Sequence, residues 1–211
     1  HDAIEKLGAN KLQALVLDLR NNPGGVVKTA LEAASMFLRP GQRILTARGR
    51  SKQVDSADVP PSATPYRFRL AILMNEKTAS ASEIFAGALQ DHDRATIVGQ
   101  PSYGKGLVQS VMPLSDGAGL AITTAFYYTP SGRTIQRPLR NSALSSTFAN
   151  KPAATAPAYK TDQGRKVVGG GGIQPDIAVD PEALTRLESV LDASGVVTST
   201  HWIATAVGMS I

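Results

Sequence analysis

A serine and a lysine in this chain have the surroundings that acyl-transfer chemistry requires. Ser80 follows the apolar run Leu70–Met74 and precedes the amphipathic stretch Glu83–Leu89. A strand-to-helix turn of this kind exposes a hydroxyl beside the unpaired backbone N–H groups at the start of a helix. Lys105 stands between two glycines, and a lysine that has lost its proton can act as the base for a serine nucleophile. Together the two residues predict a Ser/Lys hydrolase.

Both residues also have a structural interpretation. Ser80 with Glu83 fits a capping box, in which serine and glutamate satisfy free N–H groups at the start of a helix. An isolated lysine is usually a solvated surface residue. A histidine base is another alternative, because His92 lies between Asp91 and Asp93. His92 is about 18 Å from Ser80 along a helix, which indicates a surface residue at the helix end rather than a base.

A series of segments is more specific than either residue alone. In chain order they are Leu17–Gly25, Thr78–Glu83, Gly104–Gln109, Tyr128–Arg133 and Gly172–Asp176. In sequence and order they resemble the motifs of the C-terminal processing peptidases, also called tail-specific proteases, over about residues 10 to 180. The resemblance implies an α/β fold, a spiral of β-strands and helices related to the crotonase and Clp protease folds. It also implies a serine endopeptidase that cleaves proteins near their C-termini.

The resemblance carries residue roles with it. The catalytic residues that it implies are Ser80 as nucleophile, Lys105 as base and Gln109 as the residue that positions the lysine. We expect an oxyanion hole from the N–H of Ala81 and an N–H of Gly24 or Gly25, since glycine lets the backbone approach a substrate closely. Lys105 acts as base only if its amine is buried, because desolvation favours the neutral form, and the apolar neighbours Leu107 and Val108 would help. Asp18 and Arg20 are expected to pair structurally within the core, and Tyr128–Arg133 to form a structural turn near the active site.

The rest of the chain alternates between strand and helix patterns. Strands are expected at residues 12–19, 43–47, 67–74, 96–98, 107–112 and 120–127, and helices at 3–7, 27–38, 80–90 and 181–191. This order favours helices packed on a mostly parallel sheet. The stretch at 49–65 is polar and is expected to be a loop.

The domain organisation follows from these patterns and from the resemblance. Residues 1–195 are assigned to the catalytic core, with a flexible segment at about 139–170, and 196–211 to a tail without a recognised motif. Relatives of this kind usually carry a PDZ domain that recognises substrate tails, together with one more strand before the first motif. Neither is found here, so the core is expected to be N-terminally incomplete, with a PDZ domain in the parent protein.

Composition excludes several other classes. The chain has no cysteine, which removes thiolate catalysis and disulfides, and it shows no His/Asp/Glu cluster with metal-ligand spacing, so no metal or cofactor is expected. Its net charge is +5, but the positive residues are scattered and only 5% of residues are aromatic, so no nucleic-acid partner is expected. No apolar run approaches the roughly 20 residues that cross a bilayer.

Partners and location come from the resemblance alone. It implies protein or peptide substrates bound through their C-terminal tails, and it leaves a homo-oligomer open. The expected location is periplasmic or otherwise extracytoplasmic, or a plastid lumen, with membrane association through N-terminal sequence outside this chain. The alternative function is a catalytically inert or ligand-binding module of the same fold. The presence of both Ser80 and Lys105 argues against it, because an inert relative needs neither.

Overall fold

The structure, a computed structural model, describes residues 1–50, 54–138 and 158–179. The chain divides into two units, His1–Val179 and Asp180–Ile211, and every described residue belongs to the first. The sequence-based expectations for 139–157, for a helix at 181–191 and for a tail at 196–211 therefore lie outside the described residues.

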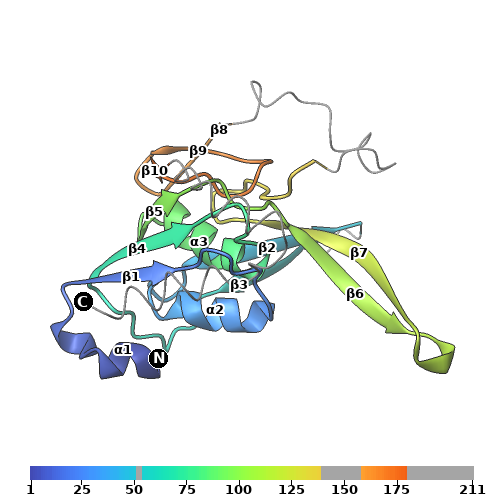
Figure 1. The fold of residues 1–211 in the computed structure, drawn as a ribbon, viewed down its shortest axis with the longest axis horizontal. Coiled ribbons are helices and arrows are strands. Elements are labelled where there is room, and N and C mark those ends of the chain that lie inside the picture. The colour runs from blue at the N-terminus through green and yellow to red at the C-terminus, as the bar shows by residue number, and fades with distance from the viewer. Residues whose placement is uncertain (51–53, 139–157, 180–211) are drawn as a thin grey trace, which may run out of the picture. The chain divides into compact units, whose positions relative to one another are not determined.

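Four parallel strands form the sheet that supports the serine (Figure 1). In spatial order they are β1 (Ala14–Asp18), β4 (Arg69–Met74), β5 (Thr96–Gly99) and β10 (Ile177–Ala178). Leu17 of β1 lies opposite Ile72 of β4, which lies opposite Ile97 of β5. Because the strands are parallel, their carboxyl ends share one edge of the sheet, and the loops that follow β1 and β4 meet there.

A second sheet is antiparallel and carries the segment after the lysine. In spatial order its strands are β3 (Val54–Asp58), β2 (Arg43–Gly49), β7 (Gly119–Tyr128) and β6 (Leu107–Pro113). A short 3-10 turn, η2 (Ser115–Gly117), joins β6 to β7, and Figure 1 shows this hairpin extending away from the parallel sheet. The fold is therefore mixed α/β, as expected, but the strands are not mostly parallel.

The central element is α3 (Ala81–Asp91), all of whose residues are buried. It contacts β5 of the parallel sheet, β2 of the antiparallel sheet and the other long helix, α2 (Val27–Ser35). Small residues permit this burial: a Cβ added at Gly87 would lie 2.8 Å from Ile173 Cδ1. The described residues also include two short N-terminal helices, α1 (Asp2–Lys6) and η1 (Ala9–Lys11).

Two segments expected to be loops contain strands. The polar stretch 49–65 includes β3, which pairs along β2 as an edge strand. The end of the expected flexible segment contains β8 (Ala158–Lys160) and β9 (Lys166–Val168), an antiparallel pair. The turn between them is held by ion pairs, including Arg165 with Asp93 at 2.6 Å, which the composition of the segment does not reveal.

Candidate active site

Ser80 occupies the turn between β4 and α3 in a conformation that few residues adopt. Its φ is 57° and its ψ is −119°, so it is one of the four non-glycine residues with positive φ among those described. Such strained backbone persists only where the surroundings hold it, and it concentrates at functional sites. A nucleophile exposed on a sharp strand-to-helix turn has this geometry.

The loop after β1 holds this turn from one side. Thr78 Oγ1 donates to the carbonyl of Leu19 at 2.7 Å, and the N–H of Ala79 donates to the carbonyl of Asn22 at 2.9 Å. Two hydrogen bonds join Asn75 and Asn21, each at 2.9 Å. The backbone N–H of Asn21 donates to Asn75 Oδ1, and Asn75 Nδ2 donates to Asn21 Oδ1. The expected loop at the end of β1 is thus fixed directly against the serine turn.

The two glycines of that loop differ in their surroundings. A Cβ added at Gly24 would lie 2.7 Å from the nitrogen of Ala81 and 2.5 Å from the carbonyl oxygen of Ala79, so the Gly24 backbone packs directly on the serine turn. The N–H of Gly24 donates to Asn22 Oδ1 at 3.0 Å, whereas nothing lies within 4 Å of a Cβ added at Gly25. The N–H of Ala81, first residue of α3, has no acceptor within the helix.

Asp18 and Arg20 pair as expected at the end of β1. Arg20 Nη2 lies 2.7 Å from Asp18 Oδ2, and this hydrogen bond raises the pKa of Arg20. Both side chains are about half exposed, so the pair lies on the surface beside the loop rather than inside the fold.

Lys105 lies in the segment before β6, whose residues alternate between buried and exposed. Ser102, Gly104 and Gly106 are buried, whereas Tyr103 and Lys105 are exposed. The burial that the base role requires of Lys105 is therefore not found in this structure. Within the described residues no hydrogen bond joins the side chains of Ser80 and Lys105.

Glu83 links the serine turn to the lysine segment, a role beyond the capping box predicted from sequence. Its carboxylate is fully buried. Oε2 accepts the N–H of Ser80 and the N–H of Lys105, each at 2.8 Å. Oε1 accepts the N–H of Gly104 at 2.7 Å and the hydroxyl of Ser102. The backbone nitrogens of Ser80 and Lys105 consequently lie no farther apart than twice 2.8 Å.

Gln109 is an exposed residue of β6, and no hydrogen bond connects it to Lys105 in the described part of the chain. A different glutamine contacts the lysine segment: Gln136 Oε1 accepts the N–H of Gly106 at 2.9 Å. Sequence reasoning missed Gln136, because its approach depends on the chain returning beside Gly106 after the β6–β7 hairpin.

His92 lies at the other end of α3 and is not the surface residue expected. Its side chain is only 8% exposed. Nδ1 lies 2.7 Å from Asp162 Oδ2, and Nε2 lies 2.7 Å from the carbonyl oxygen of Arg43. Both ring nitrogens are thus engaged in holding the β8–β9 turn against β2, away from Ser80.

The turn at Tyr128–Arg133 also lies at this end of α3, so it is structural as expected but not near Ser80. Arg133 is fully buried, and its Nη2 lies 2.7 Å from Asp91 Oδ1 and 2.7 Å from Gln90 Oε1. Burial lowers the pKa of Arg133, while Asp91 acts in the opposite direction.

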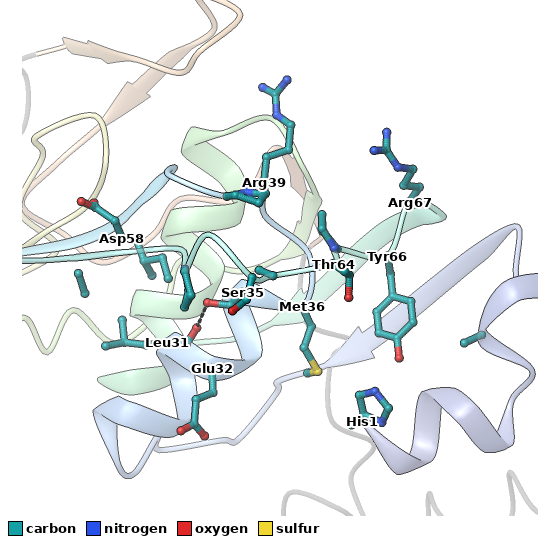
Figure 2. A pocket seen from close by; sticks show the side chains of 18 of the residues that line it. His1, Leu31, Glu32, Ser35, Met36, Arg39, Asp58, Thr64, Tyr66 and Arg67 are labelled. Carbon is teal, nitrogen blue, oxygen red and sulfur yellow. Dashed lines mark hydrogen bonds between the residues drawn. The ribbon is translucent and has the colours of Figure 1, made fainter.

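Other features do not compete with this site. A cavity of about 1350 Å³ is lined by residues of α1 and α2 and of the segment 57–68, among them Leu31, Met36 and Tyr66 (Figure 2). None of the expected site residues lines it. The described residues contain no group of three or more His, Asp or Glu side chains that could hold a metal ion. Among them there is also no helix long and apolar enough to cross a membrane.

Comparison with known proteins settles the family. The model of "Peptidase family S41" matches residues 1–140, which include Ser80, Lys105 and the loop after β1. The chain belongs to peptidase family S41. The expected family is therefore confirmed.

Individual relatives of this S41 chain carry related names. It is 44% identical over 135 residues to a carboxy-terminal-processing protease of Bartonella bacilliformis, covering 64% of this chain and 31% of the relative. It is 36% identical over 197 residues to a chloroplastic C-terminal processing peptidase of Tetradesmus obliquus, covering 92% of this chain and 34% of the relative. A solved structure, the photosystem II D1 C-terminal processing protease, matches with a TM-score of 0.63 and 32% identity, covering 90% of this chain and 41% of that one. The S41 chain thus spans about a third of the length of these curated relatives.

Proposed function

We propose that this S41 chain is the catalytic core of a serine endopeptidase that cleaves proteins near their C-termini, with Ser80 as nucleophile and Lys105 as base. The observation that carries the proposal is the shared contact on Glu83 Oε2, which both backbone N–H groups reach at 2.8 Å. Two segments held this closely lie within reach of the flexible four-carbon side chain of a lysine.

The proposed reaction is acyl transfer in two steps. Ser80 Oγ attacks the carbonyl carbon of the scissile bond while Lys105 Nζ, in its neutral form, accepts the hydroxyl proton. The lysine then gives that proton to the departing amine, and water hydrolyses the acyl-enzyme. Gln109 is retained as a residue that orients the lysine once the site is occupied.

The oxyanion would be stabilised by backbone N–H groups. Ala81 supplies one, because the first residues of a helix have free N–H groups directed outward. The second comes from Gly25 in preference to Gly24, since the Gly24 N–H already donates to Asn22. Gly24 instead supports the hole by packing against the nitrogen of Ala81.

The exposure of Lys105 bears on when the site is active. A base needs a neutral amine, and desolvation favours that form, so catalysis requires that something covers the side chain. We propose that substrate, together with parts of the longer protein such as a PDZ domain, provides this cover. The same exposure favours the second candidate, in which the chain by itself binds peptides but does not cleave them.

Substrates, assembly and location follow the names of the relatives. We propose that the substrates are proteins with apolar C-terminal tails, recognised mainly by a PDZ domain of the parent protein, and that a homo-oligomer is compatible with the fold. Several relatives are named chloroplastic, and one belongs to the cyanobacterium Synechocystis. These names support an extracytoplasmic or lumenal location, with membrane association through other parts of the protein.

The test compares three variants in the complete protein with a peptide that ends in an apolar tail. Ser80→Ala and Lys105→Ala should each lower kcat by at least about 1000-fold, because members of one catalytic unit fail together. Ser82→Ala, two residues along the same turn, should retain activity. If Ser80→Ala turns over normally and Ser82→Ala does not, the nucleophile has been misassigned. Equal cleavage of a peptide with a charged tail would contradict the substrate proposal.

A further inference from the structure

Ser102 is a buried hydroxyl that the proposed chemistry does not use. It lies between β5 and Lys105 and has no exposed surface. Its backbone pairs with Ile173, with the Ser102 N–H donating to the Ile173 carbonyl at 3.0 Å. Its Oγ accepts the N–H of Ile173 at 2.7 Å and donates to Glu83 Oε1.

The direction of the Ser102 proton is set by these two partners. A serine hydroxyl carries a single proton and rotates to suit its surroundings. Because the N–H of Ile173 can only donate, the oxygen of Ser102 must accept there, and its own proton points to Glu83. The hydroxyl therefore connects the segment before β10 to the carboxylate of Glu83 through two hydrogen bonds.

The two oxygens of the Glu83 carboxylate contact different groups. Oε1 is held by Ser102 and by the N–H of Gly104, whereas Oε2 contacts the N–H groups of Ser80 and Lys105. Rotation of the carboxylate would move Oε2 away from the serine and lysine backbones together. The groups on Oε1 prevent that rotation, and Ser102 provides the only side chain among the four donors.

The packing around Ser102 leaves little freedom for it to move. A Cβ added at Gly172 would lie 2.5 Å from the carbonyl oxygen of Ser102 and 2.7 Å from its Oγ. The Gly172 backbone thus lies directly against Ser102 and fixes the hydroxyl from behind. Gly172 has a φ of +80°, a conformation that favours glycine, so this contact is built into the turn before β10.

We propose that Ser102 is a positioning residue of the Ser80/Lys105 site, which acts through Glu83 to set the separation of nucleophile and base. The inference rests on the proposed function. Serine nucleophiles are sensitive to such control, because misplacement by about 1 Å can cost about 100-fold in rate. Loss of the hydroxyl should therefore affect turnover more than substrate binding.

The experiment compares Ser102→Ala with Ser82→Ala in the complete protein. Ser82 is a matched control, because it is a buried serine in the first turn of α3 and its hydroxyl makes no hydrogen bond within the described part of the chain. At a temperature where circular dichroism shows every variant folded, kcat of Ser102→Ala should fall by about 10- to 100-fold, with KM changed less than about threefold. The rate of Ser80 labelling by a fluorophosphonate should fall in parallel. Ser82→Ala should change neither.

A second variant covers the case in which Ser102→Ala does not fold. Ser102→Cys keeps the shape of the side chain and a weak donor on a larger atom, so the cavity left by alanine is avoided and kcat should be intermediate. Wild-type kcat and labelling rate in a folded Ser102→Ala or Ser102→Cys would overturn the positioning role. Full activity of Ser80→Ala would instead overturn the proposed function. An inactive Ser80→Ala with fully active Ser102 variants would leave the proposed function intact and remove Ser102 from it.

Discussion

Replacement of Glu83 by glutamine tests whether the carboxylate is the structural link that the geometry indicates. The change preserves shape but exchanges one oxygen for an NH2 group. Whichever way the amide lies, at least one backbone donor that now contacts an oxygen will face the NH2 group. In one orientation these donors are the N–H groups of Ser80 and Lys105. In the other it is the N–H of Gly104, because the hydroxyl of Ser102 can rotate and accept from the NH2 group.

The expected magnitude follows from the number of lost contacts. A hydrogen bond to a charged group contributes about 1.5 to 3 kcal/mol, and at least one is lost. Part of this loss is offset because a neutral amide is less costly to bury than a carboxylate. The free energy of unfolding of Glu83→Gln should therefore fall by about 1 to 3 kcal/mol.

The assay is urea unfolding of the complete chain followed by circular dichroism. The midpoint should decrease while the slope with denaturant stays constant, which identifies a change in stability rather than in the surface exposed on unfolding. Glu32→Gln is the control, because Glu32 is 65% exposed and its nearest cation, Lys28, lies 3.8 Å away. Glu32→Gln should lower the free energy of unfolding by less than about 1 kcal/mol. Equal stability of wild type and Glu83→Gln would refute the reasoning.

Two further substitutions test other parts of the structure. Gly24→Ala should lower the free energy of unfolding in urea by about 2 to 4 kcal/mol, because Gly24 has a φ of +86° and an added Cβ would lie only 2.7 Å from the nitrogen of Ala81. Gly25→Ala is the control, because an added Cβ meets open space there. It should lower the free energy of unfolding by less than about 1 kcal/mol. Burial by itself would raise the pKa of Asp93, but the hydrogen bonds from Arg165, Gln163 and Thr161, together with the charge of Arg165, outweigh burial and lower this pKa. The resulting stability is present above about pH 4 and is lost as the pH falls through the lower folded-state pKa, so Asp93→Asn should cost about 1 to 2 kcal/mol at pH 7 and progressively less below pH 4 in urea unfolding. A cost that is constant or larger in acid would contradict this.

The sequence predicts the serine turn well because the local signals agree there. An apolar strand, a serine and an amphipathic helix follow one another, and α3 begins at Ala81, directly after Ser80. The capping interpretation and the catalytic one are compatible, since Glu83 does reach the N–H of Ser80. The further contacts of Glu83 with Gly104 and Lys105 join segments distant in the chain, which local patterns do not report.

The errors have the same origin in tertiary contacts. β3 is polar because it is an edge strand, so no hydrophobic alternation marked it. His92 is buried because Asp162 and the Arg43 carbonyl meet its ring, and both lie far away in sequence. Lys105 is exposed although the role of base requires a buried amine. The chemistry proposed for a residue therefore does not by itself predict how deeply the fold buries it.

The contacts around Ser80 also determine when, during folding, the site comes into existence. The bond from Thr78 to Leu19 closes a separation of 59 residues, and that from Lys105 to Glu83 closes one of 22. Contacts so distant in sequence form only after the intervening chain has ordered, because each requires loop closure. A nascent or partly folded chain therefore has a serine and a lysine but no assembled pair. In the proposed peptidase, the order of folding would itself restrain cleavage during synthesis and export.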